Sequence, residues 1–557
     1  MRRRPALVLV PLALLFLVSG LVQAWRDSPT VDEAIDIAAG VTSVVRHDLR
    51  LSPEHDVAIH VLPAVPALFA HPVVPDGPGY QSDDWFEHTD EFIRANQEAG
   101  RLQRVVFLSR LVPLMEGLAV AWLLYLLGAR LFGTTAGILS SALWLTTPVF
   151  IGFSHIVSID VAFTLATLAV CLALLRFLER PSTGWAAVVA VAVGAALLTR
   201  HSALVLLAVV LAVIVIVGWR DGRAPSVWLQ HAGIVAFGSW ATVWLCVRLL
   251  AFTAPGGEAG ARLDGYIAQG RHDSLITRLV LSVPWPKEWA AGFAYLVQTS
   301  TAKPAYVLGH AWDGGHWWYF LAMVPVKVPF VALIVMVVGP FGWRHVAREK
   351  VRLALAVVVA PALALYVAVA LQPLDLGLRY AFPPLALWFV AAGPAVLLGT
   401  PPLRRVAAAV LGVTQIAAAV AAYPHSIAWT PPPFTPAYQW TTDSNVDYGQ
   451  DTRLVNEWAV GKQPLVDLLL PRGVDLPAGS RPLLDVPPVE VQGWVAVSAT
   501  RLTALDRDQL AWLRAYCPVG TIGGSVLLYR FDAPIDPSPG PTKPVGICSG
   551  DVSTRTG

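Results

Sequence analysis

Long apolar runs alternate with short polar segments along most of the chain, and this pattern predicts a protein that crosses a membrane many times. A transmembrane helix needs about 20 mostly apolar residues. The sequence therefore predicts an all-α polytopic membrane domain over residues 1–422 with about eleven spans. The expected spans are 5–23, 105–127, 133–153, 160–178, 183–199, 201–218, 231–253, 318–340, 352–371, 380–398 and 403–422.

The first apolar segment allows two interpretations. Basic residues at positions 2–4 precede it and Val22-Gln23-Ala24 ends it, as in a cleavable signal peptide. A chain with many later spans needs no removable signal, so we expect an uncleaved first helix.

Lys and Arg residues collect in alternate loops and set the predicted orientation, because short cytoplasmic loops carry an excess of these residues. With a cytoplasmic N-terminus, the inner loops contain Arg130, Arg176, Arg180, Arg220, Arg223, Arg344, Arg348, Lys350, Arg352, Arg404 and Arg405. Three larger regions then lie outside: a first loop of about 25–104, a loop of about 254–317, and everything after Tyr423.

The polar C-terminal part predicts a separate extracytoplasmic domain. We expect residues 423–531 to form a small soluble α/β domain, with an amphipathic helix at Arg501–Tyr516 and a strand at Val526–Phe531. Residues 532–557 are rich in Pro, Gly and Ser and predict a disordered tail.

Composition excludes an ordinary soluble domain. The chain is 55% hydrophobic and 14% charged, whereas soluble domains are about 25% charged. No basic tract predicts nucleic-acid binding. Cys517 and Cys548 lie where a disulfide is permitted, but the sequence leaves open whether they pair. No CxxC or zinc-type spacing is present. We expect neither a metal nor a cofactor, because Lys327, Arg379 and their neighbours can meet the charge of a phosphate.

Carboxylates at the outer face are candidates for catalysis. Asp32-Glu33 follows the first span by about ten residues, and Asp160 opens the fourth span just after His155. A carboxylate there could take the proton of an acceptor hydroxyl. The pair Asp32-Glu33 is equally typical of the first turn of a helix, where acidic residues favour the helix dipole.

Cations on the same face are candidates for binding a phosphate. Lys327 lies ~13 Å into the eighth span, where a charge needs a cavity or a partner. Arg379 and Tyr380 mark the outer end of the tenth span, and Arg200 lies in the outer turn between the fifth and sixth. Arg binds phosphate well, although Arg-Tyr is also a common interfacial anchor.

Several segments together resemble one family. They are Asp32-Glu33, Pro53-Glu54-His55, LLTRHSALVLL (197–207), AYVLGHAWDGGHWWYFLAMVPVKVP (305–329), LGLRYAFPPLAL (376–387) and, within 423–458, YPHSIAW and TTDSNVDYGQDTRLVNEW. The chain resembles bacterial polyprenyl-phosphate-dependent glycosyltransferases of the GT-C superfamily, in the protein-mannosyltransferase-like group (family 39). The resemblance implies a multi-pass protein of the bacterial inner membrane.

The resemblance also implies an activity: transfer of mannose or a similar sugar, with inversion, from a polyprenyl-phosphate carrier to an extracytoplasmic protein, glycolipid or polysaccharide. It implies Asp32 as general base with Glu33 beside it, and Asp160 as a second acidic residue. Residues implied to hold the carrier phosphate or to support the site are Lys327, Arg379, Tyr380, Arg200, His60, Glu54, His55 and His155.

The chain departs from the family pattern at specific positions. Where the family commonly has Glu-His-Pro-Pro-Leu-x-Lys, this chain reads EHDVAIH over 54–60, so His60 takes the Lys position. Asp375 replaces an Asn, and Tyr448 replaces the Trp of Asp-Trp-Gly-Gln. These changes leave the sugar and details of donor binding open. A polytopic transporter or a lipid-linked sugar flippase is the alternative function, although we find none of the inverted repeats that transporters usually show. A third possible function is that of an inactive scaffold with the same fold.

Overall fold

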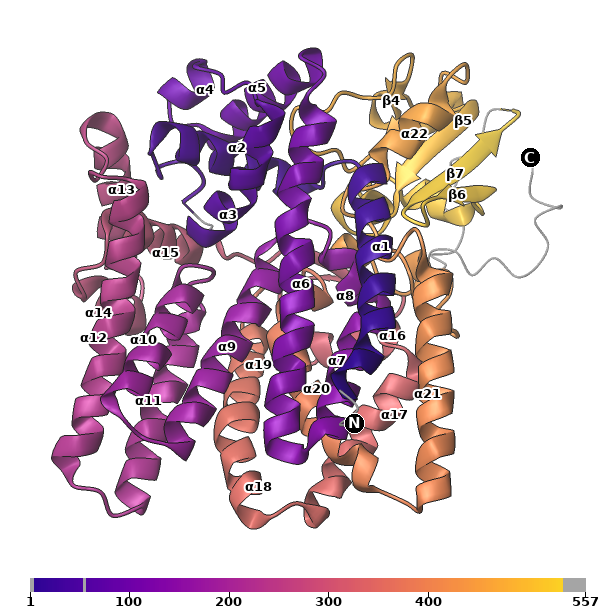
Figure 1. Ribbon diagram of the computed structural model, residues 1–557. Coiled ribbons are helices and arrows are strands. Elements are labelled where there is room, and N and C mark those ends of the chain that lie inside the picture. Colours follow the sequence, from indigo (N-terminus) through magenta and orange to yellow (C-terminus); the bar gives the residue numbers. More distant parts are fainter. Residues whose placement is uncertain (1–4, 54–56, 534–557) are drawn as a thin grey trace.

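The computed structural model describes residues 5–53 and 57–533, and it is a bundle of helices with additional layers at one end (Figure 1). Its long helices are α1 (Val10–Arg26), α6 (Leu102–Phe132), α9 (Ile159–Glu179), α11 (Ala203–Arg220), α12 (Pro225–Leu250) and α21 (Pro401–Ala422). Shorter helices complete the bundle: α7 (Thr134–Thr146), α8 (Pro148–Phe153), α10 (Thr183–Leu197), α16 (Tyr319–Lys327), α17 (Phe330–Val338), α18 (Arg348–Ala354), α19 (Ala360–Ala370) and α20 (Phe382–Ala392).

The predicted multi-pass helical membrane fold is confirmed. Within the described residues, eight helical stretches are long and apolar enough to cross a membrane: Leu7–Arg26, Leu102–Phe132, Ile159–Glu179, Ala203–Arg220, Pro225–Leu250, Arg348–Ala370, Leu378–Leu397 and Pro401–Ala422. The count of about eleven spans stays a prediction, because three of the expected spans are not continuous helices of this length.

Prolines and a short length explain these three differences. Helix α7 ends before Pro148, and α16 ends before Pro329; a proline disfavours helical backbone at the preceding residue. The expected spans 133–153 and 318–340 are therefore each divided into two helices. Helix α10 is a single helix of only 15 residues.

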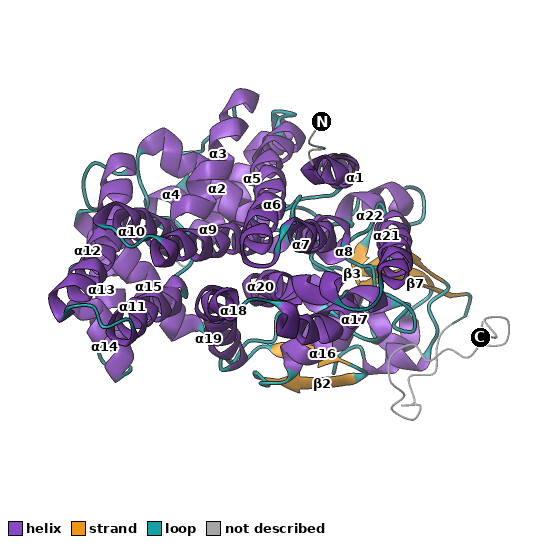
Figure 2. Ribbon diagram, turned by 60° about the horizontal axis from the view of Figure 1, so that its bottom comes forward, coloured by secondary structure: helices purple, strands orange, loops and turns teal. Residues whose placement is uncertain are grey.

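An aromatic core holds the centre of the bundle together. Figure 2 shows α20 near the middle, with α6, α7 and α9 on one side and α17 and α19 on the other. Trp144 stacks on Phe150 with ring centroids 4.2 Å apart, and Phe150 meets Phe382 edge-on at 4.8 Å. All three side chains are fully buried. This packing fixes α20 and the 3₁₀ turn Leu378–Ala381 that leads into it.

The first loop folds into a helical layer over one end of the bundle (Figure 1). It contains α2 (Val31–Arg46), α3 (Val57–Ala67), α4 (Pro78–Gln81) and α5 (Trp85–Glu98). The second loop contains α13 (Gly257–Gly270), α14 (Leu275–Ser282), α15 (Lys287–Thr299) and a hairpin of β1 (Pro304–Val307) and β2 (His310–Asp313).

A small mixed sheet forms the C-terminal region, at the same end of the molecule as the first-loop helices (Figure 1). Its strand order is β4-β3-β5-β7-β6, with β3 parallel to both β4 and β5, and β7 antiparallel to β5 and β6. The strands are β3 (Leu465–Asp467), β4 (Arg481–Pro482), β5 (Gly493–Ser498), β6 (Gly520–Ile522) and β7 (Val526–Phe531), with α22 (Thr452–Ala459) before them. The small α/β domain and the strand at Val526–Phe531 are confirmed.

The predicted amphipathic helix at Arg501–Tyr516 is wrong as a continuous element. The structure has a π-helical turn at Arg501–Leu505 and a separate 3₁₀ turn at Ala511–Ala515. The Arg514 side chain donates to the carbonyls of Leu502 and Arg507, so these carbonyls bind a guanidinium in place of helical amides. The predicted disordered tail from 534 onward, and with it Cys548, lies outside the described residues.

Candidate active site

Glu33 is the residue that fixes the turn between α1 and α2. Its carboxylate accepts from Arg110 Nε at 2.8 Å and Nη2 at 2.7 Å, and both side chains are fully buried. It also accepts from the backbone N–H groups of Thr30 and Val157, each at 3.0 Å. Because both oxygens are occupied and no surface is exposed, we propose that Glu33 positions the site and does not touch substrate.

Arg110 extends this anchor to the backbone before α2. It donates to the carbonyls of Ala24 and Asp27 at 2.9 and 2.8 Å, and to that of Ser28. A helix N-terminus favours a carboxylate, and α2 begins at Val31, so Asp32 lies in its first turn. The buried ion pair therefore decides where the Asp32 side chain lies.

Asp32 faces Arg379 and Tyr448 at the centre of the candidate site. Arg379 Nη2 lies 3.2 Å from Asp32 Oδ2, and the Tyr448 hydroxyl donates to the same oxygen. Arg379 Nη1 donates to the Tyr448 oxygen at 2.6 Å. The Asp32 side chain is 39% exposed whereas that of Arg379 is only 8% exposed. A carboxylate that solvent can reach therefore rests against a buried cation.

Asp160 and Arg200 complete the cluster. Arg379 Nη1 lies 3.7 Å from Asp160 Oδ2, and Arg200 Nη1 lies 3.4 Å from Asp160 Oδ1. The Tyr380 ring lies close to both guanidinium groups, 4.7 Å from that of Arg200 and 5.3 Å from that of Arg379. The structure thus brings together five candidates from four distant segments: Asp32, Asp160, Arg200, Arg379 and Tyr380.

The cluster has donors and acceptors to spare. Asp32, Asp160, Arg200 and Arg379 carry two negative and two positive charges. Among the described residues, neither Arg379 Nε nor Asp160 Oδ2 has a hydrogen-bond partner. Burial, together with the carboxylates of Asp32 and Asp160, raises the pKa of the Tyr448 phenol well above its ordinary value, although Arg379 acts the other way. The phenol stays protonated and donates to Asp32.

Lys327 lies outside this cluster, contrary to the expectation that it holds the carrier phosphate. Its ammonium group donates to three backbone carbonyls, those of Ile427 and Trp429 at 2.6 Å and that of Asn445 at 2.7 Å. An ammonium has three N–H donors, so all of them are used, and the side chain is fully buried. We propose a structural role for Lys327, which ties α16 to the segments after α21.

The candidate histidines also lie apart from the cluster. His60 is buried beside Asp36, with Nε2 3.3 Å from Oδ1, and the His155 Nε2 lies 2.9 Å from Asp27 Oδ2. These contacts pack α3 on α2 and hold the residues after α8 against the turn that follows α1. Glu54 and His55 lie outside the described residues.

The sequence patterns predict no site role for Tyr448, Arg110 or Asn445. In the sequence Tyr448 is a departure from the family's Trp, yet its hydroxyl contacts both Asp32 and Arg379. Asn445 Oδ1 accepts from the Leu378 N–H at 2.9 Å, beside Arg379. The segment DSNVDYGQD that contains Asn445 and Tyr448 was the available signal. No sequence signal indicates a role for Arg110, because a single Arg in an apolar helix does not show which residue it pairs with.

No candidate metal centre was found within residues 5–53 and 57–533: no three His, Cys, Asp or Glu side chains there are grouped so that they could hold an ion.

Comparisons with known proteins agree with this architecture. Residues 103–245 match the family model of the dolichyl-phosphate-mannose-protein mannosyltransferases. The structure is similar to the oligosaccharyltransferase of Archaeoglobus fulgidus in its apo form, with a TM-score of 0.50 and 12% identity over 92% of this chain and 71% of that chain. The chain has a GT-C fold. The predicted resemblance to GT-C glycosyltransferases is confirmed.

A second GT-C structure is ArnT from Cupriavidus metallidurans in the apo state, with a TM-score of 0.48 and 13% identity over 93% of this chain and 97% of that chain. No curated protein matches the sequence significantly. At these identities the structural likeness concerns the fold, and the roles of individual residues rest on the geometry of this GT-C site.

Proposed function

We propose that this GT-C protein transfers a sugar, mannose or a similar hexose or pentose, from a polyprenyl-phosphate carrier to an acceptor hydroxyl on the extracytoplasmic side of the membrane. The observation that carries the proposal is the pairing of a half-exposed carboxylate, Asp32, with buried Arg379. The match of residues 103–245 to mannosyltransferases that use a dolichyl-phosphate donor supports this class of donor.

Asp32 is the proposed general base. Its Oδ2 is held by Arg379 and Tyr448, and among the described residues no hydrogen bond is made to Oδ1. Oδ1 takes the proton of the acceptor hydroxyl as the acceptor oxygen attacks the anomeric carbon. The bond from that carbon to the phosphate oxygen breaks, the polyprenyl phosphate leaves with the electron pair, and the sugar is inverted.

Arg379 and Arg200 are the proposed phosphate partners. The leaving phosphate gains negative charge in the transition state, and fixed cations in a poorly solvated site stabilise that charge. Both guanidinium groups are at most one-tenth exposed and border the same carboxylate, Asp160. Asp160 holds the two guanidinium groups in place when no phosphate is bound. The proposed mechanism requires no metal ion.

The test uses purified full-length protein in lipid with radiolabelled polyprenyl-phosphate mannose, with and without a crude cell-envelope fraction as acceptor. Wild type is compared with Asp32→Asn. We expect release of sugar from the carrier that depends on the envelope fraction and falls about 10²–10⁴-fold in the variant. Asp508→Asn is the matched control, because its side chain is 95% exposed on the C-terminal domain.

Two outcomes would contradict the proposal. If well-folded wild type released no mannose and no other carrier-linked sugar, transport or a scaffold role would be favoured instead. If Asp32→Asn released sugar at the wild-type rate, the transfer activity would stand and another residue would be the base.

A further inference from the structure

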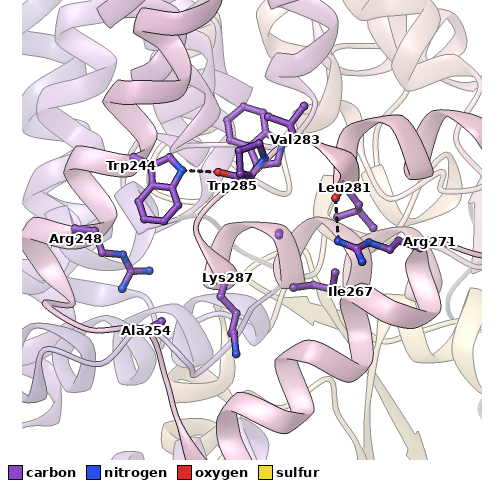
Figure 3. A pocket seen from close by; sticks show the side chains of 11 residues that line it. Trp244, Arg248, Ala254, Ile267, Arg271, Leu281, Val283, Trp285 and Lys287 are labelled. Carbon is purple, nitrogen blue, oxygen red and sulfur yellow. Dashed lines mark hydrogen bonds between the residues drawn. The ribbon is translucent and has the colours of Figure 1, made fainter.

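A cavity of about 480 Å³ lies outside the candidate active site, where the outer end of α12 meets the helices of the second loop. Its wall contains Trp244 and Arg248 from α12, Arg271 from the end of α13, and Trp285 and Lys287 at the beginning of α15. Figure 3 shows Arg248 on one side, Arg271 on the other and Lys287 between them.

The cavity is positively charged and retains unused donors. Arg248 pairs with Glu288, and Lys287 lies 2.9 Å from Asp264. Within the described part of the chain, no carboxylate pairs with Arg271; its side chain donates only to the Leu281 carbonyl, at 3.4 Å. Arg248 Nε is buried and has no hydrogen-bond partner there. The surplus is one positive charge with free guanidinium N–H groups, which suits a phosphate.

Two of the helices that contribute to the cavity wall, α12 and α14, also carry exposed apolar side chains. Helix α14 exposes more than half of the Leu275, Ile276 and Leu279 side chains. Leu249 and Phe252, at the outer end of α12, are also more than half exposed. A short amphipathic helix beside a transmembrane helix is typical of the membrane interface, where its apolar face enters the acyl region. We therefore expect the cavity to lie at the level of the lipid headgroups.

Two tryptophans indicate the depth at which this region lies in the bilayer. The indole N–H groups of Trp240 and Trp244 both donate to the Pro284 carbonyl, at 3.0 and 2.6 Å. Tryptophan is enriched at the level of the lipid headgroups because its ring is apolar and its N–H is polar. The Arg248 guanidinium lies 5.6 Å from the centre of the Trp244 ring, so it belongs to the same region.

We infer that this cavity binds the headgroup phosphate of an anionic phospholipid of the bilayer, with Arg271, Lys287 and Arg248 around the phosphate. The acyl chains then lie against the exposed leucines of α14 and the end of α12. The site is separate from the candidate active site, since no residue of the cavity wall contacts Asp32 or Arg379.

An aromatic row connects the lipid site to the active-site wall. Trp285 packs against Trp289 in a tilted arrangement with ring centroids 4.2 Å apart, and the Trp289 ring lies 4.8 Å from that of His201, the neighbour of Arg200. His201 Nε2 lies 3.2 Å from the Trp289 carbonyl oxygen. A lipid bound at the cavity would therefore steady α15 and, through it, the turn that carries Arg200.

Native mass spectrometry of the full-length protein tests the inference. The protein is titrated with phosphatidylglycerol, phosphatidylcholine or undecaprenyl phosphate, and wild type is compared with the double variant Arg271→Gln/Lys287→Gln. We expect phosphatidylglycerol to bind the double variant about tenfold more weakly. The matched control is Arg104→Gln, an exposed arginine at the outer end of α6, which should bind as wild type does.

Three results would overturn the inference. Equal binding of phosphatidylglycerol by wild type and double variant would remove the cavity from lipid binding. Equal binding of phosphatidylcholine and phosphatidylglycerol to wild type would show that the cations are not used. A preference for undecaprenyl phosphate that depends on Arg271 would assign the cavity to the carrier instead. If the double variant does not fold, crosslinking of wild type with photoreactive phosphatidylglycerol decides, since label away from α12–α15 would also overturn the inference.

Discussion

Glu33 and Arg110 form a doubly hydrogen-bonded ion pair, at 2.8 and 2.7 Å, without any exposure to solvent. The pair joins the first turn of α2 to the first third of α6, and Asp32 is the residue directly before Glu33. Asp32 and Glu33 therefore have different roles. Glu33 faces inward and holds the backbone, while Asp32 faces the site and remains accessible.

Removing one partner of this ion pair should destabilise the fold. Glu33→Gln leaves the Arg110 charge buried without its counter-ion, so we expect the free energy of unfolding to fall by about 3–5 kcal/mol. Thermal unfolding of the purified protein measures this. Glu457→Gln, which breaks the exposed Arg453–Glu457 pair, should change stability by less than about 0.5 kcal/mol. A Glu33 variant that is stable but inactive would instead indicate a direct role in chemistry.

The Tyr448 hydroxyl should contribute to turnover and little to folding. Tyr448→Phe keeps the ring, whose centroid lies 4.6 Å from the Arg379 guanidinium, and removes the donor to Asp32. We expect turnover to fall about tenfold, because the variant loses the hydrogen bond that orients the base and also the oxygen that accepts from Arg379 Nη1. Tyr306→Phe is the control, since Tyr306 is buried and its hydroxyl donates to the Gln439 carbonyl, away from Asp32 and Arg379. Equal turnover in both variants would exclude Tyr448 from positioning Asp32.

Variants of Lys327 and Arg200 should distinguish a cation with a structural role from one that binds the phosphate. Lys327→Met leaves three buried carbonyls without their donor, and we expect a loss of about 2–4 kcal/mol of stability with an unchanged donor KM in the folded fraction. Arg200→Gln should raise the donor KM about tenfold with a smaller loss of stability. Unfolding curves and initial rates at varied donor concentration measure both. A raised donor KM in a stable Lys327→Met protein would return Lys327 to the phosphate site. Lys350→Met, in a partly exposed ion pair, controls for loss of a lysine.

Asp447 should make the stability of the C-terminal region depend on pH. Burial raises the pKa of this carboxyl from an ordinary 3.8 to about 7, although it accepts hydrogen bonds from the Gly449 and Thr500 N–H groups. Between those two values the folded state binds more protons than the unfolded state, so stability decreases as pH rises from about 4 to 7 and then levels off. The decrease is at most about 1.4 kcal/mol per pH unit.

Melting temperatures between pH 4 and 8 test this expectation. Asp447→Asn should show a shallower dependence than wild type, because the amide does not titrate. Parallel curves for the two proteins would mean that Asp447 does not ionise in this range.

Much of the candidate site was predictable from motifs. Asp32, Asp160, Arg200, Arg379 and Tyr380 come together as the shared predicted face required. Lys327 does not join them, because depth in an apolar helix shows only that a charge needs partners, and those partners are carbonyls more than 90 residues away in the chain. The position of Lys327 in an apolar helix correctly predicts that its charge needs polar partners. The sequence does not show that these partners are distant backbone carbonyls.

The sequence by itself determined that this is a multi-pass helical membrane protein with a small C-terminal α/β domain. The length of an apolar segment is a local property, and the thickness of the bilayer sets the length that a membrane-spanning helix needs. The distribution of Lys and Arg predicts that this domain and the polar chemistry lie on the extracytoplasmic side, and this orientation stays a prediction. Only the tertiary structure decided which carboxylate of the acidic pair is accessible, which cations are left for a phosphate and that Tyr448 completes the site. These properties depend on side-chain direction and on contacts between distant segments, and no local pattern specifies either.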